Sequence, residues 1–309
     1  MSKLWHIVLN PKAGRGEAES MWREQQAYLE RQGYRFLRIS VTSGDTLSDE
    51  ITLAIEAGAR RLVVLGGDGT FHHVVNGVMR QRACPSSEVT LVLWSVGTGN
   101  DWTRHYGMPR NKLAWRTMFM AQKTRLQDLG VIEAMGSHGD PILRYFNNVA
   151  GLGYDAYVVK HLLDNNVRQS GGIKYFLSVF RCLSKYRSKP LRVTTSDGSW
   201  ENPFYTLNAG ICRYNGGGMR FVPQADEADG LLAISMLRKI PAWRVAINVP
   251  WAYTPFFNRH HLVRSGQVPW VMYEHTGADP VWVEADGELI GHTPARLSVK
   301  PLAIRFICP

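Results

Sequence analysis

The sequence lacks any run of about 18 consecutive apolar residues, so we expect no segment to span a bilayer as a helix. It also lacks an internal repeat and a low-complexity tract, which excludes fibrous and solenoid proteins. Its first residues run directly into a strand-like pattern, and we therefore expect no cleavable signal peptide.

Cysteine is scarce and scattered. Cys84, Cys182, Cys212 and Cys308 form no CxxC pair and have no neighbouring histidine at metal-binding spacing. We expect reduced, mostly buried thiols in a reducing compartment, rather than a disulfide framework or a zinc site. The expected location is the cytoplasm.

Acidic residues are the minority charge. The chain has 36 Lys and Arg against 26 Asp and Glu, an excess that favours polyanionic partners such as nucleotides, nucleic acid or an anionic membrane. Near an acidic bilayer each basic side chain contributes about 1 kcal/mol of attraction. A well-solvated basic surface gives the same composition, so charge alone does not choose among these partners. No motif for DNA or RNA binding is present, which places nucleic acid last.

With 309 residues, the chain is long enough for two domains, and its first part alternates strand and helix patterns. Strands are expected at residues 4–9, 34–39, 61–65 and 89–94, and helices at 17–32, 47–57, 71–81 and 112–121. This alternation predicts βαβ units and a parallel sheet, with ligands at the carboxyl ends of the strands.

The sequence pattern changes after about Asp128. Short strand patterns at residues 144–149, 191–195, 204–209, 232–236, 281–285 and 295–299 are separated by Gly, Asn, Asp and Pro. They predict antiparallel sheets, with a helical insert at about 156–188. We expect an N-terminal domain at 1–128 and a C-terminal domain at 129–309, while a last strand at 302–307 fits either domain.

Three glycine-bearing loops each follow an expected strand: NPKAGRG at 10–16, GGDGT at 66–70 and VGTGND at 96–101. Glycines at such turns let backbone N–H groups approach phosphate oxygens, and the following helix adds its positive end. Asn10, Thr70 and Thr98 can add hydrogen bonds, while Asp68 and Asp101 can position magnesium or its waters. One such loop is commonly only a tight connection, but three in one sheet indicate phosphate handling.

The usual nucleotide motifs GxxxxGK[ST] and GxGxxG are absent, so the nucleotide must be held in another way. The three loops, in this order and spacing, resemble the diacylglycerol kinase catalytic domain. That domain is shared by bacterial soluble diacylglycerol kinases, related bacterial lipid kinases, and sphingosine and ceramide kinases. The resemblance continues through DLG at 128–130, NNVAGLGYD at 147–155, Pro223, DGL at 229–231 and DGE at 286–288, and so covers nearly the whole chain.

The resemblance implies an α/β protein with two domains. The N-terminal domain would be Rossmann-like, related to NAD kinases and phosphofructokinases, and the C-terminal domain a β-sandwich, with ATP held in the cleft between them. The implied reaction transfers the γ-phosphoryl group of ATP to a hydroxyl of a membrane lipid, with diacylglycerol as the first expectation. Sphingoid bases, phosphatidylglycerol and other membrane alcohols stay open. The enzyme would meet an anionic membrane peripherally during catalysis, and a homodimer is compatible with the sequence.

The resemblance assigns ATP contacts to the loops and to the end of the second strand. These contacts are Asn10, Pro11, Lys12, Ala13, Gly14, Ser40, Gly66, Gly67, Asp68, Gly69, Thr70, Thr98 and Asn100. Ser40 precedes Gly44 and Asp45 at the spacing that the family uses for a hydroxyl, and Thr42 takes its place if the register is shifted.

Metal and catalytic roles are implied in the same way. Asp229 resembles a magnesium-binding carboxylate, with backbone carbonyls of Asp226 and Leu231 completing that site. Asp68, with a catalytic role, belongs with Asp101 and Asp128 to an acidic network that reaches this metal through water. Glu288 resembles the general base that accepts the proton of the acceptor alcohol, an effect typically worth about 10²- to 10⁴-fold in rate.

Some features have plainer interpretations. His72 and His73 stand where the family has Asn and Glu, and we interpret them as a local substitution rather than a metal site, because no third ligand is evident. The aromatic-rich stretch at 243–257 fits ordinary packing, an acyl-chain groove or a membrane interface. His260 and His261 are expected in a solvated connector.

Two other functions stay open. NAD kinases share GGDG on a similar N-terminal fold, but the GTGND segment and the DGE motif fit the lipid-kinase pattern better. A nucleotide- or lipid-binding regulator with weakened catalysis is favoured by His73, while Asp68, Asp229 and Glu288 are all retained.

Overall fold

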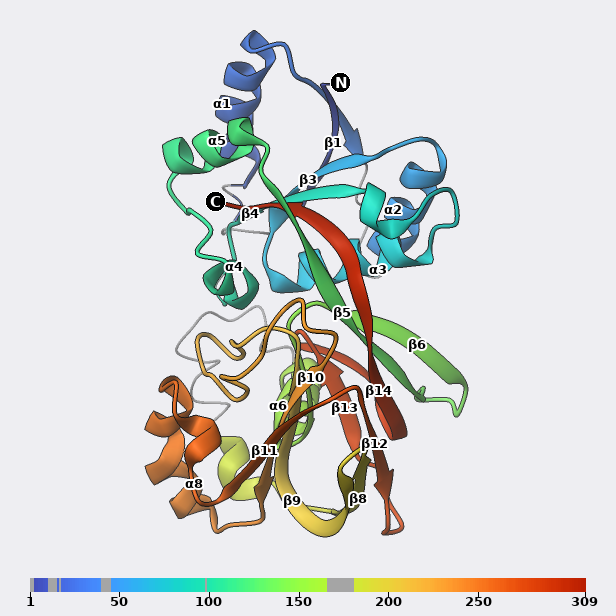
Figure 1. Ribbon diagram of the computed structural model, residues 1–309, viewed down its shortest axis with the longest axis vertical. Coiled ribbons are helices and arrows are strands. Elements are labelled where there is room, and N and C mark those ends of the chain that lie inside the picture. Colours follow the sequence, from blue (N-terminus) through green and yellow to red (C-terminus); the bar gives the residue numbers. More distant parts are fainter. Residues whose placement is uncertain (1–2, 11–15, 17, 40–45, 98, 166–180) are drawn as a thin grey trace. The chain divides into compact units, whose positions relative to one another are not determined.

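A computed structural model describes residues 3–10, 16, 18–39, 46–97, 99–165 and 181–309. The chain divides into two compact units, Met1–Leu129 with Pro301–Pro309 and Gly130–Lys300. The last strand therefore returns to the first unit, one of the two possibilities that the sequence left open. The order of elements in the chain can be followed by colour in Figure 1.

The first unit is built on a parallel sheet with the strand order β14-β4-β3-β1-β2 (Figure 1). Its strands are β1 (Leu4–Leu9), β2 (Arg35–Ile39), β3 (Arg61–Gly66), β4 (Thr90–Ser95) and the end of β14 (Glu288–Ile307). Leu9 pairs with Leu65, and Gly66 pairs with Ser95. The carboxyl ends of β1, β3 and β4 consequently meet at one edge, where parallel sheets bind ligands.

Helices cover both faces of this sheet. α1 (Ala18–Arg31) and α5 (Lys112–Ala121) share a buried core with one face of β1, β3 and β4. In this core the indole of Trp115 stacks between Trp94 and Phe119, with ring centroids 5.0 and 5.3 Å away. α2 (Leu47–Glu56) and α3 (Asp68–Arg80) contact each other and the strands β2 and β3. α2 and α3 approach closely at Gly77, where a Cβ atom would lie 2.6 Å from Ile51.

Local sequence accounts for these helices. The buried side chains of α1 are Ala18, Trp22, Gln25 and Leu29, a spacing that forms one helical stripe. Helix α5 begins after Asn111, whose side-chain oxygen accepts hydrogen bonds from the amides of Leu113 and Ala114 at 2.8 and 3.2 Å. Asparagine is among the preferred residues at this capping position.

The second unit consists of antiparallel pairs. Its strands are β6 (Pro141–Phe146), β7 (Val149–Gly153), β8 (Pro190–Thr195), β9 (Gly198–Gly210), β10 (Leu232–Arg238), β11 (Val263–Val268), β12 (Trp270–His275) and β13 (Trp282–Ala285), with the second half of β5 (Thr124–Met135) and most of β14. The long strands β9 and β14 belong to two layers. One layer has the order β11-β10-β9-β7-β13-β14, and in the other β8 pairs with β9 and β12, which pairs with β14.

Short helices flank these sheets in the second unit. α6 (Tyr154–Asp164) and the helix at residues 181–185 pack on β9 through the cluster Tyr154, Val158, Leu162, Cys182, Leu183 and Tyr205. They are followed along the chain by α8 (Ala242–Asn248), η4 (Val249–Tyr253) and η5 (Phe257–Arg259). Elsewhere, η2 (Ser86–Glu88) and α4 (Asp101–His105) belong to the first unit.

The predicted fold class is confirmed: a parallel α/β unit is followed by an antiparallel β unit. Some predicted elements were wrong in detail. The helix expected at 71–81 begins at Asp68, because Gly67 takes the extended capping conformation directly after β3. The strand expected at 144–149 is broken at Asn147 and Asn148, between β6 and β7.

No helix in the described part of the chain is both long and apolar enough to cross a bilayer. All four cysteines are free thiols. Cys182, Cys212 and Cys308 are buried, and Cys84 is partly exposed.

Candidate functional site

The first two glycine loops are joined by a side-chain hydrogen bond. Asn10 follows β1 and its amide Nδ2 donates to Oγ1 of Thr70 at 3.1 Å, while the Asn10 backbone N–H donates to the carbonyl of Leu65 at 3.1 Å. Thr70 lies in the first turn of α3, directly over Gly66, where a Cβ atom would come within 2.5 Å of the threonine side chain. The GGDGT loop is therefore folded tightly against the end of β1.

The second and third loops touch backbone to backbone. A Cβ atom on Gly97 would lie 2.8 Å from Cα of Gly67, and one on Gly67 would lie 3.3 Å from Cα of Gly97. Approaches below 3.0 Å to a backbone atom force the chain to shift, so glycine is required at Gly97 for steric reasons rather than for its φ angle.

Asp68 links the GGDGT loop to the start of α4. Its carboxylate accepts hydrogen bonds from the backbone N–H groups of Asp101 at 3.2 Å and Trp102 at 3.4 Å. A negative charge at a helix N-terminus satisfies amides that have no partner within the helix. Asp68 thus positions the segment that carries Asn100 and Asp101. Its predicted role toward a metal is separate from this contact.

Asn100 and Asp101 are both buried. Asn100 has left-handed backbone (φ 54°), and its side chain accepts from the Ser95 hydroxyl and donates to the carbonyl of Gly97. Asp101 pairs with the guanidinium of Arg104 one turn along α4. The structure therefore brings Asn10, Gly66, Gly67, Asp68, Thr70, Asn100 and Asp101 together at one edge of the sheet.

Asp128 lies within β5 and is fully buried. Its Oδ1 accepts a hydrogen bond of 2.7 Å from the backbone N–H of Leu302, a residue with left-handed φ of 46°. This contact fixes β14 where it enters the first unit. Its neighbour Gln127 accepts hydrogen bonds from the indole of Trp102 at 2.8 Å and the hydroxyl of Tyr106 at 2.9 Å.

His72 and His73 follow the GGDGT loop within α3. His72 is buried, and its Nε2 lies 3.3 Å from Nδ2 of Asn76 one turn away. The two imidazoles meet edge to face, with centroids 5.6 Å apart. Within the described residues, no three His, Cys, Asp or Glu side chains converge in a cluster that could hold a metal ion.

The DGE motif forms a two-residue β-hairpin turn in the second unit. Ala285, which ends β13, pairs with Glu288, which begins β14, and the two residues between them have positive φ angles of 52° at Asp286 and 81° at Gly287. Asp-Gly is a favoured sequence for this type I′ geometry. Glu288 is partly exposed and comes directly after the turn.

Two carboxylates hold the DGE turn in place. Asp286 accepts hydrogen bonds from the backbone N–H groups of Asn147 at 3.1 Å, Asn148 at 3.0 Å and Val149 at 3.3 Å. The Asp286 N–H donates back to the carbonyl of Val149 at 3.0 Å. Buried Glu284 accepts from the Gly287 N–H at 3.0 Å. The position of Glu288 is thus fixed by its neighbours in the hairpin.

Asp226 and Asp229 lie in an exposed turn before β10. The Asp226 carboxylate accepts from the N–H of Ala228 at 3.1 Å. The Asp229 carboxylate accepts from the N–H of Leu231 at 2.9 Å and from Nε2 of Gln267 at 2.6 Å. Magnesium prefers oxygen ligands and is commonly held by one or two carboxylates with several waters. The carboxylates and backbone carbonyls of this exposed turn are a donor set of that kind, so the residues fit the ion.

Asp155 is a candidate site residue to which sequence reasoning gave no role, although it ends the NNVAGLGYD motif. It lies in the first turn of α6, and the hydroxyl of Thr206 on β9 donates to its carboxylate at 2.8 Å. A Cβ atom on Gly151 would lie 2.6 Å from the Glu284 carboxylate and 3.0 Å from Cβ of Asp155. Gly151 thus makes room for both acidic side chains above β7.

Loss of water contact raises the pKa of Asp155 from 3.8 to about 6, against the opposing hydrogen bonds from Thr206 and Asn208. Burial of Tyr186 and Tyr205 themselves, together with the nearby charge of Asp155, raises the pKa values of these two tyrosines. A carboxyl group whose proton equilibrium is shifted toward neutral pH is typical of functional sites.

The raised pKa of Asp155 predicts a pH-dependent loss of stability. Between pH 3.8 and about 6 the folded chain retains a proton that the unfolded chain has released, so stability falls as pH rises and the full loss is present above about pH 6. We expect Asp155→Asn to be more stable than wild type at pH 8 by about 1–3 kcal/mol, and equally stable at pH 3.5.

Denaturant unfolding at several pH values checks this prediction. Asp164→Asn is the matched control, because Asp164 ends the same helix but is exposed and paired with Lys160. Equal stability of wild type and Asp155→Asn at pH 8 would show that the Asp155 carboxylate is not destabilising in the folded protein.

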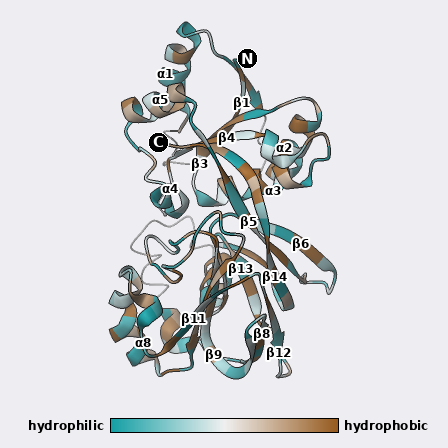
Figure 2. Ribbon diagram, viewed as in Figure 1, coloured by the Kyte–Doolittle hydropathy of each residue, from teal (hydrophilic) through white to brown (hydrophobic). Residues whose placement is uncertain are grey.

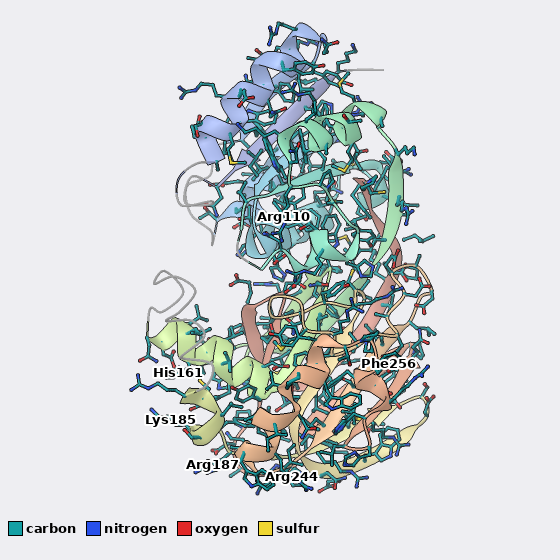
Figure 3. The ribbon with its side chains drawn as sticks, turned by 90° about the vertical axis from the view of Figure 1, so that its left-hand side faces the viewer. Arg110, His161, Lys185, Arg187, Arg244 and Phe256 are labelled. Carbon is teal, nitrogen blue, oxygen red and sulfur yellow. The ribbon has the colours of Figure 1, made fainter. Side chains whose placement is uncertain are left out.

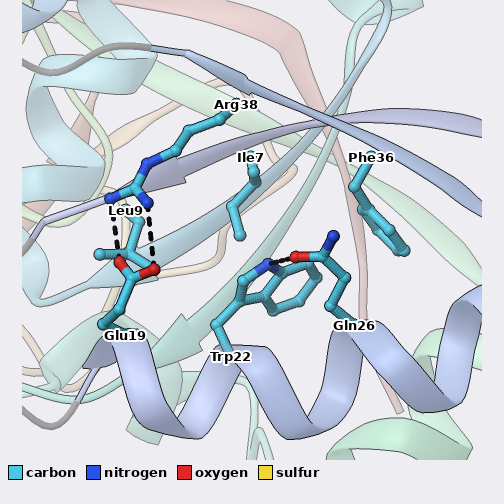
Figure 4. A pocket seen from close by; sticks show the side chains of 7 residues that line it. All are labelled: Ile7, Leu9, Glu19, Trp22, Gln26, Phe36 and Arg38. Atoms are coloured by element: carbon cyan, nitrogen blue, oxygen red, sulfur yellow. Dashed lines mark hydrogen bonds and ion pairs between the residues drawn. The ribbon is translucent and has the colours of Figure 1, made fainter.

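A small pocket lies under α1 in the first unit (Figure 4). It is lined by Ile7, Leu9, Glu19, Trp22, Gln26, Phe36 and Arg38. The Arg38 guanidinium pairs with the Glu19 carboxylate at 2.9 and 3.1 Å. The volume of this pocket, about 70 Å³, is far below the roughly 300–1,000 Å³ of small-molecule sites, so the pocket cannot enclose a nucleotide.

Several predicted ATP contacts lie outside the described residues, namely Pro11, Lys12, Ala13, Gly14, Ser40 and its alternative Thr42, and Thr98. The roles assigned to the other site residues stay predictions. Asp286 was recognised from the sequence only as part of the DGE motif, with no role of its own, and Glu284 was not singled out.

The loops described above are matched by family models. Residues 4–132 match the diacylglycerol kinase catalytic domain, and residues 148–308 match the YegS C-terminal NAD kinase beta sandwich-like domain. The chain belongs to the diacylglycerol kinase catalytic-domain family. As a member of this family it is a lipid kinase.

Relatives agree with this assignment. A Pseudomonas aeruginosa (strain UCBPP-PA14) protein named "Probable lipid kinase YegS-like" is 30% identical over 282 residues, which cover 91% of this chain and 87% of the relative. A diacylglycerol kinase of Mycobacterium tuberculosis (strain H37Rv) is 27% identical over 306 residues, covering 98% and 94% of the two chains.

Solved structures support the fold. A diacylglycerol kinase from Bacillus anthracis superposes with a TM-score of 0.70 at 19% identity, covering 100% of this chain and 97% of the other. Yeast NADH kinase complexed with NADH gives a TM-score of 0.53 at 12% identity, covering 100% and 84%. Both likenesses concern the fold alone.

Proposed function

We propose that this lipid kinase transfers the γ-phosphoryl group of ATP to the free hydroxyl of diacylglycerol and so forms phosphatidic acid. The observation that carries the proposal is the meeting of Asn10, the GGDGT loop and Gly97 at one sheet edge. The Asn10–Thr70 hydrogen bond, the Gly67–Gly97 approach and the Asp68 contacts to α4 hold this edge together. A relative named diacylglycerol kinase supports the choice of acceptor.

The proposed chemistry is phosphoryl transfer with a carboxylate as base. The oxygen of the acceptor hydroxyl bonds to the γ-phosphorus, the bond from that phosphorus to the bridging oxygen of ADP breaks, and the hydroxyl proton passes to the Glu288 carboxylate. Transfer of this kind depends mainly on alignment and on stabilising charge at the phosphoryl oxygens. Backbone amides of the glycine loops supply donors for those oxygens.

Magnesium fits this scheme at the Asp226–Leu231 turn. When bound, the ion would neutralise charge on the phosphate oxygens. The carboxylate of Asp229 and the carbonyls of Asp226 and Leu231 are its proposed ligands. Asp68 also orients the start of α4, because its carboxylate accepts hydrogen bonds from the backbone N–H groups of Asp101 and Trp102.

The acceptor can be identified by incubating the enzyme with ATP, magnesium and a total bacterial lipid extract. Mass spectrometry then compares phosphorylated lipids with and without ATP. Phosphatidic acid as the dominant new species supports the proposal, while a phosphorylated sphingoid base or phosphatidylglycerol would replace diacylglycerol as the acceptor. Phosphorylation of NAD in a parallel reaction, with no new lipid product, would overturn it.

A further inference from the structure

The segment from α8 to η5 exposes large apolar side chains that the protein core does not use. Trp243, Ile247, Trp251, Tyr253 and Phe256 are between 43 and 67% exposed, and we call these five residues the aromatic face. Among the residues that the structure describes, all mainly exposed tryptophan, tyrosine and phenylalanine side chains belong to this face. Helix α8 has no buried residue, and Figure 2 shows it in alternating apolar and polar colours.

The segment that carries the aromatic face has positive charge only. From residue 231 to residue 273 the chain carries Arg238, Lys239, Arg244, Arg259 and Arg264 but no acidic residue. The Arg244 guanidinium lies over the ring of Trp243 at 5.8 Å, and that of Arg259 over Phe256 at 5.5 Å. Apolar and cationic groups are thus presented side by side.

A second basic segment lies beside α8. Residues 181–196 also lack acidic side chains and carry exposed Lys185 and Arg187. Val245 of α8 packs against the cluster that contains Cys182 and Leu183 of this segment. Figure 3 shows Lys185, Arg187 and Arg244 at the same end of the second unit.

This combination matches the interfacial region of a bilayer. Tryptophan and tyrosine prefer the headgroup level, where their rings meet apolar chains and their polar atoms stay wet. Basic side chains are drawn to anionic headgroups, each by about 1 kcal/mol. A protein partner of acidic character could use the charge, but nothing in that pairing requires so many exposed tryptophan, tyrosine and phenylalanine rings together.

We propose that the aromatic face, with Arg244, Arg259, Lys185 and Arg187 around it, is the surface by which this protein docks on an anionic phospholipid bilayer. This inference deepens the proposed function. It rests on that function because only a lipid acceptor requires the enzyme to reach a membrane. It adds the surface that meets the bilayer and the headgroup charge that this surface selects.

Vesicle flotation of the full-length chain tests the docking surface. We expect the protein to float with vesicles of equal parts phosphatidylcholine and phosphatidylglycerol, and to float much less with phosphatidylcholine alone. Trp243→Ala with Trp251→Ala should weaken binding to the anionic vesicles at least about tenfold, since both rings lose their interfacial contacts. Arg244→Ala with Arg259→Ala should also weaken it by about tenfold and reduce its dependence on salt.

Matched controls lie in the first unit. Leu53→Ala with Leu113→Ala removes two side chains that are 65 and 67% exposed, and Arg23→Ala with Arg125→Ala removes two exposed charges. Both pairs should float as wild type does. Equal flotation of wild type and the aromatic-face variants would overturn the proposal. It would also be overturned if those variants kept vesicle binding but changed a dimer into a monomer by light scattering, because the face would then join two copies.

Kinase assays separate this inference from the proposed function. With a short-chain, water-dispersed diacylglycerol the aromatic-face variants should turn over as wild type does, while with diacylglycerol in anionic vesicles they should be slower by about tenfold. Vesicle binding through this face by a protein that phosphorylates no lipid would leave the docking surface standing and refute the kinase proposal. Normal turnover of diacylglycerol in vesicles by every variant would support the kinase proposal and refute the docking surface.

Discussion

Replacing Glu288 with Gln is expected to lower the rate of lipid phosphorylation by about 10²- to 10⁴-fold while leaving ATP affinity unchanged. The amide has nearly the size of the carboxylate but cannot accept the proton of the attacking hydroxyl. Glu288 begins β14 directly after the Asp286-Gly287 turn, so the substitution disturbs neither the turn nor the pairing with Ala285.

Initial rates with saturating ATP and calorimetric titration with ATP measure the two quantities for Glu288→Gln. Glu133→Gln is the control, because Glu133 is exposed on β5 of the same unit and should behave as wild type. Turnover by Glu288→Gln within a few-fold of wild type would refute the assignment of Glu288 as the base.

Asp286→Ala is expected to destabilise the protein by about 2–4 kcal/mol and to abolish most turnover. Its carboxylate accepts three backbone hydrogen bonds from the segment at 147–149, and alanine replaces none of them. Alanine also disfavours the left-handed conformation with φ of 52° at this position. The turn that carries Glu288 would keep its backbone hydrogen bond to Val149 but lose all side-chain bonds from Asp286 to the 147–149 segment.

Asp286→Asn separates these effects, because asparagine keeps an acceptor oxygen and tolerates left-handed backbone. We expect it to lose about half as much stability as Asp286→Ala in denaturant unfolding. Asp279→Ala is the control: its ion pair with Lys189 is exposed and should be worth less than about 1 kcal/mol. Wild-type stability of Asp286→Ala would contradict the anchoring role of the carboxylate.

A smaller effect is expected in the first unit. Gly97→Ala places a methyl group 2.8 Å from Cα of Gly67, and such overpacking typically costs about 1–3 kcal/mol. If the two loops hold ATP together, the dissociation constant for ATP rises by about ten- to a hundredfold. Gly266→Ala, whose new methyl group meets only Ile234 at 3.9 Å, should bind ATP as wild type does. Unchanged ATP affinity in Gly97→Ala would separate this contact from nucleotide binding.

The first unit was predictable because its signals are local. Strands β1, β3 and β4 are short apolar runs followed by glycine loops, and the large helices carry apolar stripes, as Ala18, Trp22 and Leu29 do in α1. The hairpin turn at Asp286-Gly287 was equally local, since that dipeptide favours positive φ angles.

The second unit was less predictable because its strands are defined by their neighbours. β9 and β14 each take part in two layers, so their sequences carry no single alternating pattern. The break at Asn147 and Asn148 is stabilised by Asp286, a residue 139 positions from Asn147 in the chain. No pattern within the 144–149 stretch could indicate that partner.

The candidate site was predictable in its members but not in their contacts. Asn10, Asp68, Thr70 and Asn100 are part of the glycine-loop motifs and could be found from the sequence. That Asp68 accepts from amides of α4, or that Asp128 accepts from Leu302, depends on distant segments meeting in the fold. Asp155 was given no role because its carboxylate loses contact with water only when α6 packs over β9. That burial depends on the fold and leaves no signal in the sequence.

The fate of the terminal phosphoryl group of ATP distinguishes a lipid kinase acting on diacylglycerol from every alternative. The enzyme is incubated with magnesium, diacylglycerol vesicles and ATP labelled either at the γ- or at the α-phosphate, and the organic phase is counted and resolved. We expect label in phosphatidic acid from γ-labelled ATP only, and almost none of it with Glu288→Gln. No γ-label in any lipid, with the label remaining in ATP or passing to a water-soluble acceptor, would contradict it.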